Sequence, residues 1–317
     1  MQLKSISSLA VGLMCLTAAH VSWAGQPTAL KDKISWPESP LFADHSLFYV
    51  AYGSHDVIRL MPNKEEIFWH EEGCGPSAIA SLPNGNFVVS CYDANSVAIL
   101  SAKGELVQRL TQDDQGQILT GPNDFAVDAR GGFYFSASGV FDVHAPVAGK
   151  VFYVSPDGKV QEVAADIHYA NGLALTPDGS KLLVAEHLAA QILSFDVADQ
   201  GALSKRHVWK KISDLVETPA DAAPTYGCDG LKIDHLGRVY IANYAGSRLL
   251  VTDAQGQLLA TVSTQGAYID NVGFGPDFLG QDASLQSPES MLYISVVQDE
   301  SQAPYPGTIY AVKNPID

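Results

Sequence analysis

The chain has 317 residues, of which 46% are hydrophobic and 17% are charged, and 35 acidic against 19 basic side chains give a formal net charge of −16. No basic tract occurs in it. Nucleic acid and membrane surfaces are therefore excluded as expected partners, because both are bound through clustered Lys and Arg.

The first 24 residues are typical of an export signal. Lys4 provides the positive start, residues 6–18 are mostly apolar, and Ser22-Trp23-Ala24 is a small-x-small cleavage site. The apolar stretch is too short for a membrane span. We therefore expect a signal peptide over residues 1–24, a periplasmic or secreted protein, and a single domain over residues 25–317.

One short phrase recurs six times after this segment. In each copy a polar residue precedes an apolar run, most plainly in Pro122-Asn123-Asp124-Phe125, Ala170-Asn171-Gly172-Leu173 and Cys228-Asp229-Gly230-Leu231. In chain order the phrases start at Glu38, Ser77, Asn123, Asn171, Asp229 and Asn271, which are 39 to 58 residues apart. A repeat of this length in a chain of strands predicts a ring of blades.

Each repeat is composed of four short runs separated by turn signals. In the third repeat the runs cover 124–127, 133–136, 150–154 and 160–163, and further third runs occur at 56–60, 96–100, 191–195, 247–251 and 308–312. Turns such as Asn84-Gly85 join the first and second runs, because Gly and Asn accept the positive φ of tight hairpins. The sequence predicts an all-β, six-bladed β-propeller with four antiparallel strands per blade.

The sixth repeat ends after its third run, which would leave an unpaired sheet edge. We expect residues 30–36 to fill that place and close the ring. The innermost strands all start on one side, the top face, where the long connections 110–120, 138–149, 211–226 and 298–307 also fall. Short turns on one face and long loops on the other are typical of a scaffold with one functional face.

A ring brings equivalent positions of its repeats to one central place. Glu38, Asn123, Asn171 and Asp229 offer only oxygen ligands, which suit a hard cation and above all calcium. Taken singly, Asn-Gly and Asp-Gly before a strand are ordinary turn signals. Their shared phase in the repeat favours a metal site formed by these four residues.

The candidates for proton transfer are few. Asp229 is the first candidate for a base, and Glu186 and His187 follow at the top end of a second strand. Neither a G-x-S-x-G elbow nor an H-E-x-x-H pair is present. A structural role remains the alternative for each histidine.

Three cysteines follow the signal segment, namely Cys74, Cys91 and Cys228. A hairpin that turns at Asn84-Gly85 would place Cys91 opposite Ala78, so we expect no disulfide between Cys74 and Cys91. We expect Cys228 to be a buried apolar side chain.

In the residues Glu38, Asn123, Asn171 and Asp229 and the phrases around them, the chain resembles the gluconolactonase–regucalcin (senescence marker protein) family. It is more remotely similar to diisopropylfluorophosphatase and the paraoxonases. The resemblance implies a divalent cation, usually Ca²⁺, in the central channel and hydrolysis of lactones or related esters. It implies metal ligation by Glu38, Asn171 and Asp229, and substrate or metal binding by Asn123.

One position departs from that family. Sugar-lactone members have an arginine where this chain has Gly121, and the expected top-face loops carry aromatic residues instead. This difference favours a more apolar lactone or ester as the substrate. We expect the protein to be a monomer. The alternative is a non-catalytic propeller that binds a ligand or protein partner on its top face.

Overall fold

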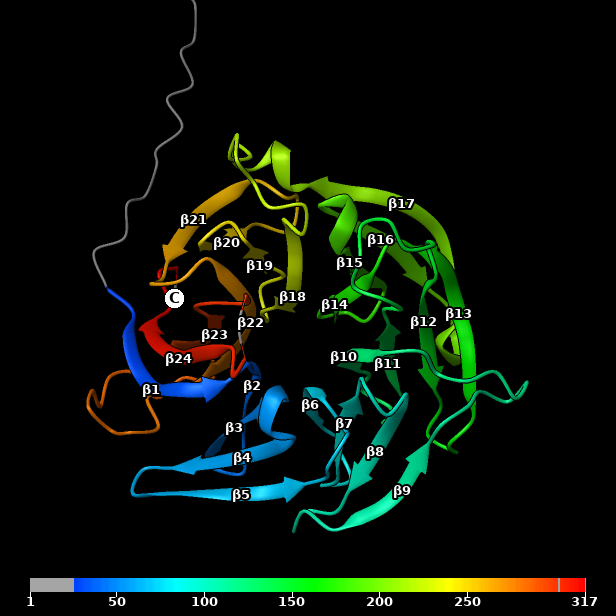
Figure 1. The fold of residues 1–317 in the computed structure, drawn as a ribbon, viewed down its shortest axis with the longest axis horizontal. Helices are drawn as coiled ribbons and strands as arrows, with labels where there is room; N and C mark the ends of the chain where they lie inside the picture. The colour runs from blue at the N-terminus through cyan, green and yellow to red at the C-terminus, as the bar shows by residue number, and fades with distance from the viewer. Residues whose placement is uncertain (1–25, 302, 317) are drawn as a thin grey trace, which may run out of the picture.

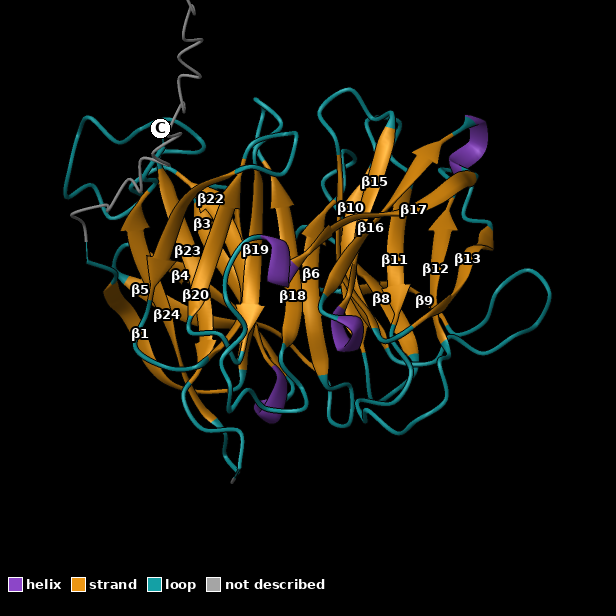
Figure 2. Ribbon diagram, turned by 90° about the horizontal axis from the view of Figure 1, so that it is seen from above, coloured by secondary structure: helices purple, strands orange, loops and turns teal. Residues whose placement is uncertain are grey.

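The computed structural model describes residues 26–301 and 303–316, and the expected signal peptide over 1–24 lies outside this range. The described residues form six four-stranded antiparallel sheets arranged as blades around an axis (Figure 1). Seen from the side, the strands run between two faces that carry the connecting loops (Figure 2). The predicted six-bladed β-propeller is confirmed.

The first three blades follow the chain without interruption. Blade 1 contains β2 (Pro37–Ala43), β3 (Ser46–Ala51), β4 (Asp56–Met61) and β5 (Lys64–His70). Blade 2 contains β6 (Pro76–Ser81), β7 (Phe87–Cys91), β8 (Ser96–Leu100) and β9 (Leu106–Leu110). Blade 3 contains β10 (Pro122–Val127), β11 (Phe133–Ala137), β12 (Gly149–Val154) and β13 (Val160–Ile167).

The last three blades complete the ring. Blade 4 contains β14 (Ala170–Leu175), β15 (Lys181–Glu186), β16 (Gln191–Val197) and β17 (Leu203–Lys211). Blade 5 contains β18 (Gly227–Ile233), β19 (Val239–Tyr244), β20 (Arg248–Thr252) and β21 (Leu258–Ser263). Blade 6 contains β22 (Tyr268–Gly275), β23 (Met291–Val297), β24 (Pro306–Lys313) and β1 (Thr28–Ser35).

The sixth blade is closed by the start of the described chain. Strand β1 pairs antiparallel with β24, with Thr28 opposite Ala311 and Ser35 opposite Pro306. Ile34 of β1 is buried in a cluster that includes Tyr49 of blade 1. The expected closure by residues 30–36 is confirmed, and it leaves the outer edge of β24 paired.

Short bottom turns are held by acidic side chains and glycine. In blade 5, Asp234 Oδ1 accepts hydrogen bonds from the backbone N–H of Leu236 (3.0 Å) and Arg238 (2.8 Å). Gly237 between them has a φ of +82°, which other residues adopt only with strain. This turn chemistry explains why the strand boundaries could be predicted closely.

The hydrophobic core is distributed between neighbouring blades. Phe125, Phe133 and Phe135 of blade 3 pack in one cluster with Val88 of blade 2. Tyr240 of blade 5 lies in an equivalent cluster with strands of blade 6. Because packing runs around the ring in this way, polar residues at the start of each innermost strand can face the axis.

The only helical elements of the described chain are single 3₁₀ turns. They are η1 (Tyr52–Ser54), η2 (His187–Ala189), η3 (Asp199–Gly201) and η4 (Ile212–Asp214). No helix in residues 26–301 and 303–316 has the length and apolar character needed to cross a bilayer.

The expectation that Cys74 and Cys91 stay apart is wrong. The two residues form a disulfide with their Cα atoms 4.5 Å apart. The register between Pro76 and Ala78 is shifted by a bulge, so Cys91 lies opposite Pro76 instead of Ala78. Cys228 is a buried free thiol, as predicted, and its Sγ lies 3.1 Å from the Gln191 carbonyl oxygen.

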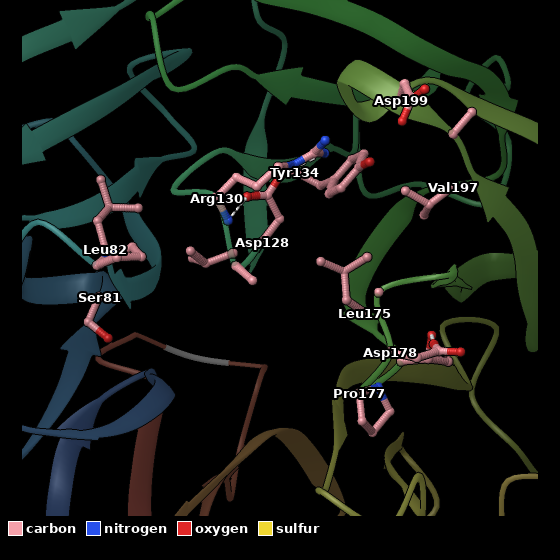
Figure 3. A pocket seen from close by; sticks show the side chains of 16 residues that line it. Ser81, Leu82, Asp128, Arg130, Tyr134, Leu175, Pro177, Asp178, Val197 and Asp199 are labelled. Atoms are coloured by element: carbon pink, nitrogen blue, oxygen red, sulfur yellow. Dashed lines mark hydrogen bonds and ion pairs between the residues drawn. The ribbon is translucent and has the colours of Figure 1, made fainter.

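Two of the cavities near the bottom face bear on the choice of site. A cavity of about 310 Å³ is lined along the axis by residues of innermost strands, among them Ser39, Asp124 and Lys232. A larger one of about 1050 Å³ lies among the bottom turns of blades 2 to 4 (Figure 3). Asp128 in this larger cavity already accepts a hydrogen bond from the Tyr153 hydroxyl (2.7 Å). The cavity is lined by no residue of the predicted ring. We therefore place the candidate site at the axis and not in this larger cavity.

Candidate active site and metal centre

Every innermost strand breaks its pairing register at the predicted ring position. The shifts fall between Glu38 and Leu41, Pro76 and Ala78, Pro122 and Phe125, Ala170 and Leu173, Cys228 and Leu231, and Ile269 and Asn271. A bulge turns a side chain out of the regular alternation of a strand. Six equivalent bulges therefore direct six polar positions toward the axis near its top end.

The structure brings acidic side chains from four blades together at this level. Burial raises the pKa of Glu38 well above its ordinary value, and the negative charges of Asp270, Asp229 and Asp124 raise it further. Burial followed by repulsion from Asp124 likewise raises the pKa of Asp229. Glu38 as a residue keeps partial exposure, whereas Asp229 is only 7% exposed. The channel thus contains more negative charge than its surroundings balance.

Two of these acids were missed by the sequence reasoning. The repeat was aligned at Asn271 in blade 6, but the bulge there leaves Asp270 as the unpaired residue. Burial and the charge of Asp229 raise the pKa of Asp270. Asp124 was visible in the phrase, directly after Asn123, and received no role. The signal in both cases was an acidic neighbour within the phrase itself.

One buried polar atom among these acids, Asp270 Oδ2, has no partner at standard hydrogen-bond geometry in the described residues. The indole Nε1 of Trp36, which directly precedes the strand carrying Glu38, also lacks a partner at that geometry, but it lies close enough to the Glu38 and Asp270 carboxylates to lower their pKa values. Asp270 as a residue is only 1% exposed. Orphaned polar atoms of this kind are costly unless a ligand, an ion or water completes them.

A chain of hydrogen bonds orients the Asn171 carboxamide. His187 Nε2 lies 2.9 Å from the Thr225 carbonyl oxygen, which can only accept, so Nε2 carries the ring proton. The other nitrogen, Nδ1, is then an acceptor for Asn171 Nδ2 at 3.2 Å. The amide oxygen of Asn171 is thereby left available to a cation.

His187 itself lies behind the ring. It is fully buried, and burial lowers its pKa to about 4. Its Nδ1 is 3.6 Å from Asp229 Oδ2, and because the imidazole is neutral near pH 7 this is a close contact and not an ion pair. These contacts indicate that His187 positions Asn171 and packs against Asp229.

Glu186 is engaged away from the other candidates. Its Oε1 accepts from the backbone N–H of His168 (2.9 Å), and its Oε2 accepts from Gln191 Nε2 (2.7 Å). Arg206 Nη2 lies 3.5 Å from the same carboxylate. The structure therefore groups Glu38, Asn171, Asp229 and the added acids, and holds Glu186 in a separate network.

Aromatic rings surround the top end of the channel. Phe141, from the β11–β12 loop, lies with its ring centroid 4.8 Å from Tyr169, 5.2 Å from His187 and 6.0 Å from Tyr244. On the other side, Trp36 lies 5.1 Å from Tyr305. Approach to the ring from the top face thus passes between aromatic surfaces.

Gly121 cannot carry a side chain without rearrangement. Its φ is +62°, and a Cβ there would lie 2.9 Å from the ring of Tyr92 and 3.2 Å from the Gly139 carbonyl oxygen. The Tyr169 hydroxyl donates to the Tyr92 hydroxyl at 3.3 Å. Tyrosine rings therefore occupy the space next to the position at which sugar-lactone enzymes of the resembling family have an arginine.

The residues present fit a hard divalent cation. The carboxylates of Glu38 and Asp229 and the Asn171 carboxamide, with the unpartnered Asp270 Oδ2 beside them, offer the oxygen-only chemistry that calcium uses. Among residues 26–301 and 303–316, His, Cys, Asp and Glu alone form no ready metal-binding group of three. A site here would depend on its carboxamides.

Fold and site together define a six-bladed propeller with an acidic, oxygen-lined axial channel. Residues 36–280 match the family described as SMP-30/gluconolactonase/LRE-like region. That match covers well over half of the chain. The chain belongs to the SMP-30/gluconolactonase/LRE-like family.

Individual relatives agree with this assignment. Lactonase drp35 of Staphylococcus aureus (strain MRSA252) is 25% identical over 223 residues, a match that spans 66% of this chain and 64% of the relative. The structure of a gluconolactonase from Xanthomonas campestris superposes with a TM-score of 0.70 at 21% identity, covering 91% of this chain and 89% of that one. The structure of regucalcin from Agrobacterium tumefaciens, a calcium-binding protein, superposes with a TM-score of 0.70 at 18% identity. The match covers 92% of this chain and 95% of that one.

Proposed function

We propose that this protein is an exported, divalent-cation-dependent hydrolase of lactones or related esters that acts in the central channel with Ca²⁺. The observation that carries the proposal is the meeting of Glu38 and Asp229, from opposite parts of the chain, with further carboxylates around them. Membership of a family with lactonases among its members supports the hydrolytic chemistry.

Export and assembly belong to the same proposal. The Cys74–Cys91 disulfide supports an oxidising compartment, periplasmic or extracellular, because such bonds rarely persist in the cytosol. The protein acts as a monomer on a small-molecule substrate. Cell fractionation and size-exclusion chromatography of the full chain test both points, and a cytosolic or oligomeric product contradicts them.

Four residues would hold the cation: Glu38, Asn123, Asn171 and Asp229. When bound, a divalent cation of this kind polarises a substrate carbonyl and offsets the negative charge that develops on its oxygen. The Asn171 oxygen is presented by the hydrogen bonds through His187 to Thr225. The Trp36 indole N–H faces the carboxylates of Glu38 and Asp270 and counteracts part of the rise in their pKa values.

Asp229 is the proposed proton acceptor. Its raised pKa makes it a stronger base than an ordinary carboxylate, although cation binding works against this gain. Asp229 takes a proton from water as the water oxygen bonds to the carbonyl carbon. The ring C–O bond then breaks, and the proton passes to the leaving alkoxide oxygen, so that one water is added in total.

The preferred substrate is an apolar or aromatic lactone or ester. The Tyr92 ring occupies the space beside Gly121, and Phe141 and Tyr244 cover the channel mouth with apolar surface. A polyhydroxylated sugar lactone would find few charged donors in this wall. We therefore expect aryl lactones and aryl esters to be turned over with a higher kcat/KM than sugar lactones.

The test is to substitute the two carboxylate ligands. Glu38→Ala and Asp229→Ala should abolish Ca²⁺ binding and lower turnover of lactones, aryl esters and phosphotriesters by at least about 100-fold, as expected when the metal site is lost. Asp157→Ala, at an exposed bottom turn, is the matched control. Full chelator-sensitive turnover in either ligand variant would refute the site. A folded wild type that binds Ca²⁺ but turns over none of these substrates would favour the binding platform instead.

A further inference from the structure

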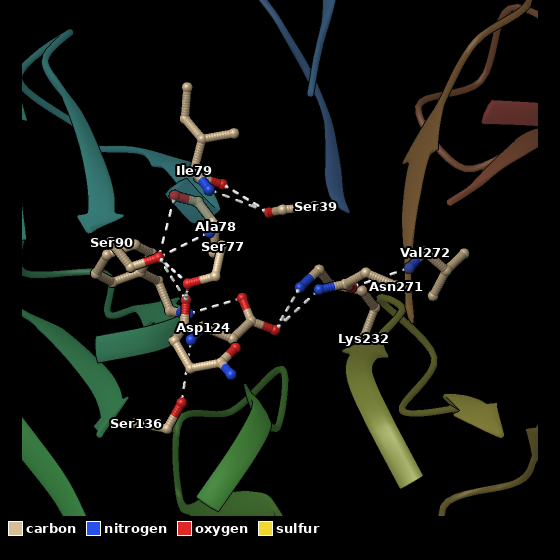
Figure 4. Close-up of polar contacts among 12 residues, drawn as sticks. Ser39, Ser77, Ala78, Ile79, Ser90, Asp124, Ser136, Lys232, Asn271 and Val272 are labelled. Atoms are coloured by element: carbon tan, nitrogen blue, oxygen red, sulfur yellow. Dashed lines mark hydrogen bonds and ion pairs between the residues drawn. The ribbon is translucent and has the colours of Figure 1, made fainter. Parts of the chain in front are cut away.

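A single lysine reaches across the axial channel just below the ring. Lys232 lies on β18 of blade 5, three residues after Asp229 and therefore nearer the bottom face. Its Nζ is 3.4 Å from Asp124 Oδ2 on β10 of blade 3. These blades are separated by blade 4, so the contact crosses the axis (Figure 4).

Asp124 is fixed from three blades. Its Oδ2 also accepts from Asn271 Nδ2 of blade 6 at 3.3 Å, and its Oδ1 accepts from its neighbour Phe125 N–H at 2.7 Å. The Asn271 amide is oriented in turn, because its Oδ1 accepts from Val272 N–H at 2.9 Å. The Asp124 side chain is 3% exposed, so its charge is balanced from within the protein.

Lys232 is the one Lys or Arg side chain of the described residues that forms an ion pair with an acid of the channel, and that acid is Asp124. Of the ion pairs in the described residues, only those of Lys232 and of the neutral His187 involve Glu38, Asp124, Asp229 or Asp270. Lys232 and Asp124 also line the axial cavity of about 310 Å³ that continues below them. The ammonium group therefore lies between the candidate ring and open space connected to the bottom face.

We propose that Lys232 is a built-in cation of the channel, which balances Asp124 and so restricts the channel to one bound divalent ion. In its absence the Asp124 carboxylate, beside a cavity large enough for ions and water, would be free to bind a second cation. Lys232 is a positioning residue in this proposal, since it acts through charge and through Asp124. The inference depends on the proposed function only for the ion in the ring.

The experiment counts bound Ca²⁺ on the chain from residue 25, stripped with chelator, by isothermal titration calorimetry. The wild type should bind one ion, and Lys232→Arg should also bind one because it keeps the charge. Lys232→Met keeps the length and removes the charge, so it should bind two ions, with affinity at the ring raised about tenfold by the loss of a nearby positive charge. Lys181→Met, which breaks a surface pair with Asp196 (2.6 Å), is the control and should bind one.

A folded Lys232→Met that binds one ion with wild-type affinity overturns the proposal. If the wild type binds none and Lys232→Met binds one, the role of Lys232 stands and the calcium-dependent function falls. If neither binds, both fall. Should Lys232→Met not fold, Asp124→Asn decides: the uncompensated ammonium should weaken Ca²⁺ binding about tenfold, and unchanged affinity contradicts the proposal.

Discussion

Individual residues in the channel are held in arrangements that cost folding free energy. Glu38, Asp229 and Asp270 have raised pKa values because they are buried together, and Asp270 Oδ2 has no partner among the described residues. Like charges and unsatisfied atoms of this kind concentrate at functional sites, where a ligand completes them. The same feature makes these residues sensitive to small changes in their neighbours.

His187 offers a direct test of such a neighbour. His187→Phe keeps the ring volume but removes the acceptor that orients Asn171. We expect Ca²⁺ affinity to fall about fivefold, the value of one ordinary hydrogen bond, with the fold retained. Calorimetric titration measures the change.

The control for that variant is His207→Phe, since His207 is exposed and bonds only to its own strand at Lys205 (3.0 Å). Unchanged affinity in both variants would show that His187 does not orient the site. Loss of turnover with affinity preserved would instead assign His187 to the chemistry.

At the level of the strand, the bulge decides which side chain faces the axis. Glu38, Asn171 and Asp229 could be predicted because the repeat phrase gives them a common phase. Asp270 was missed because the phrase in blade 6 was aligned one residue late: Asn271 N–H donates to the Ser295 hydroxyl as Asp124 N–H donates to the Ser136 hydroxyl, so Asp270 corresponds to Asn123. The missed disulfide has a different origin, the bulge at Pro76 to Ala78, which counting along the sequence does not reveal.

Strand β1 tests how much ring closure contributes to stability. Ile34 is 7% exposed and packs across the closure, so Ile34→Ala should reduce the free energy of unfolding by about 2–4 kcal/mol. Deleting residues 26–35 should abolish cooperative melting. Lys31→Ala, on the same strand with a half-exposed side chain, should change stability by less than about 0.5 kcal/mol. A cooperative transition at the wild-type temperature after the deletion would contradict closure by β1.

The disulfide at the start of blade 2 should also stabilise the fold. It closes a loop with a sequence separation of 17, so replacing both Cys74 and Cys91 with serine should cost about 3 kcal/mol, measured by urea unfolding. The unreduced chain from residue 25 should show no reactive thiol when folded and one, Cys228, when denatured. Three thiols in the denatured chain would contradict the pairing.

For the whole molecule, the candidate ion links blades that are far apart in the sequence. Its four ligands come from blades 1, 3, 4 and 5, so a bound ion would hold the ring together in addition to any catalytic role. Stability should therefore depend on calcium, by roughly 2.7 kcal/mol at 100 times the dissociation constant.

This stabilisation should depend on pH with a definite sign. Glu38, Asp229 and Asp270 have pKa values raised above those of the unfolded chain, so without calcium their contribution to stability is present at acid pH and is lost as pH rises through the raised values. Calcium offsets the lost contribution only where the acids are ionised. The increase in Tm on adding Ca²⁺ should thus be several degrees near pH 8 and should vanish near pH 4.

His187 acts on this comparison in the same direction. Its pKa is lowered to about 4, so its contribution to stability is present above roughly pH 6.5 and is lost as pH falls through 4. Because His187 Nδ1 is the acceptor that orients Asn171, its protonation near pH 4 should further weaken the calcium effect there. A calcium effect that is equal at pH 4 and pH 8 would contradict the acidic channel as the binding site.

Turn chemistry and the alternation of apolar residues act over a few positions. The blades, the strand limits and the repeated polar phrase can therefore be predicted from the amino-acid sequence alone. Contacts across the axis, such as Lys232 with Asp124, and the exact turn of Asn171 toward a cation arise only when six blades close into a ring. They join residues more than a hundred positions apart, or depend on single-residue bulges, and neither effect leaves a local pattern. The ligand types were therefore foreseeable, whereas the balance of charge around them was decided by the folded ring.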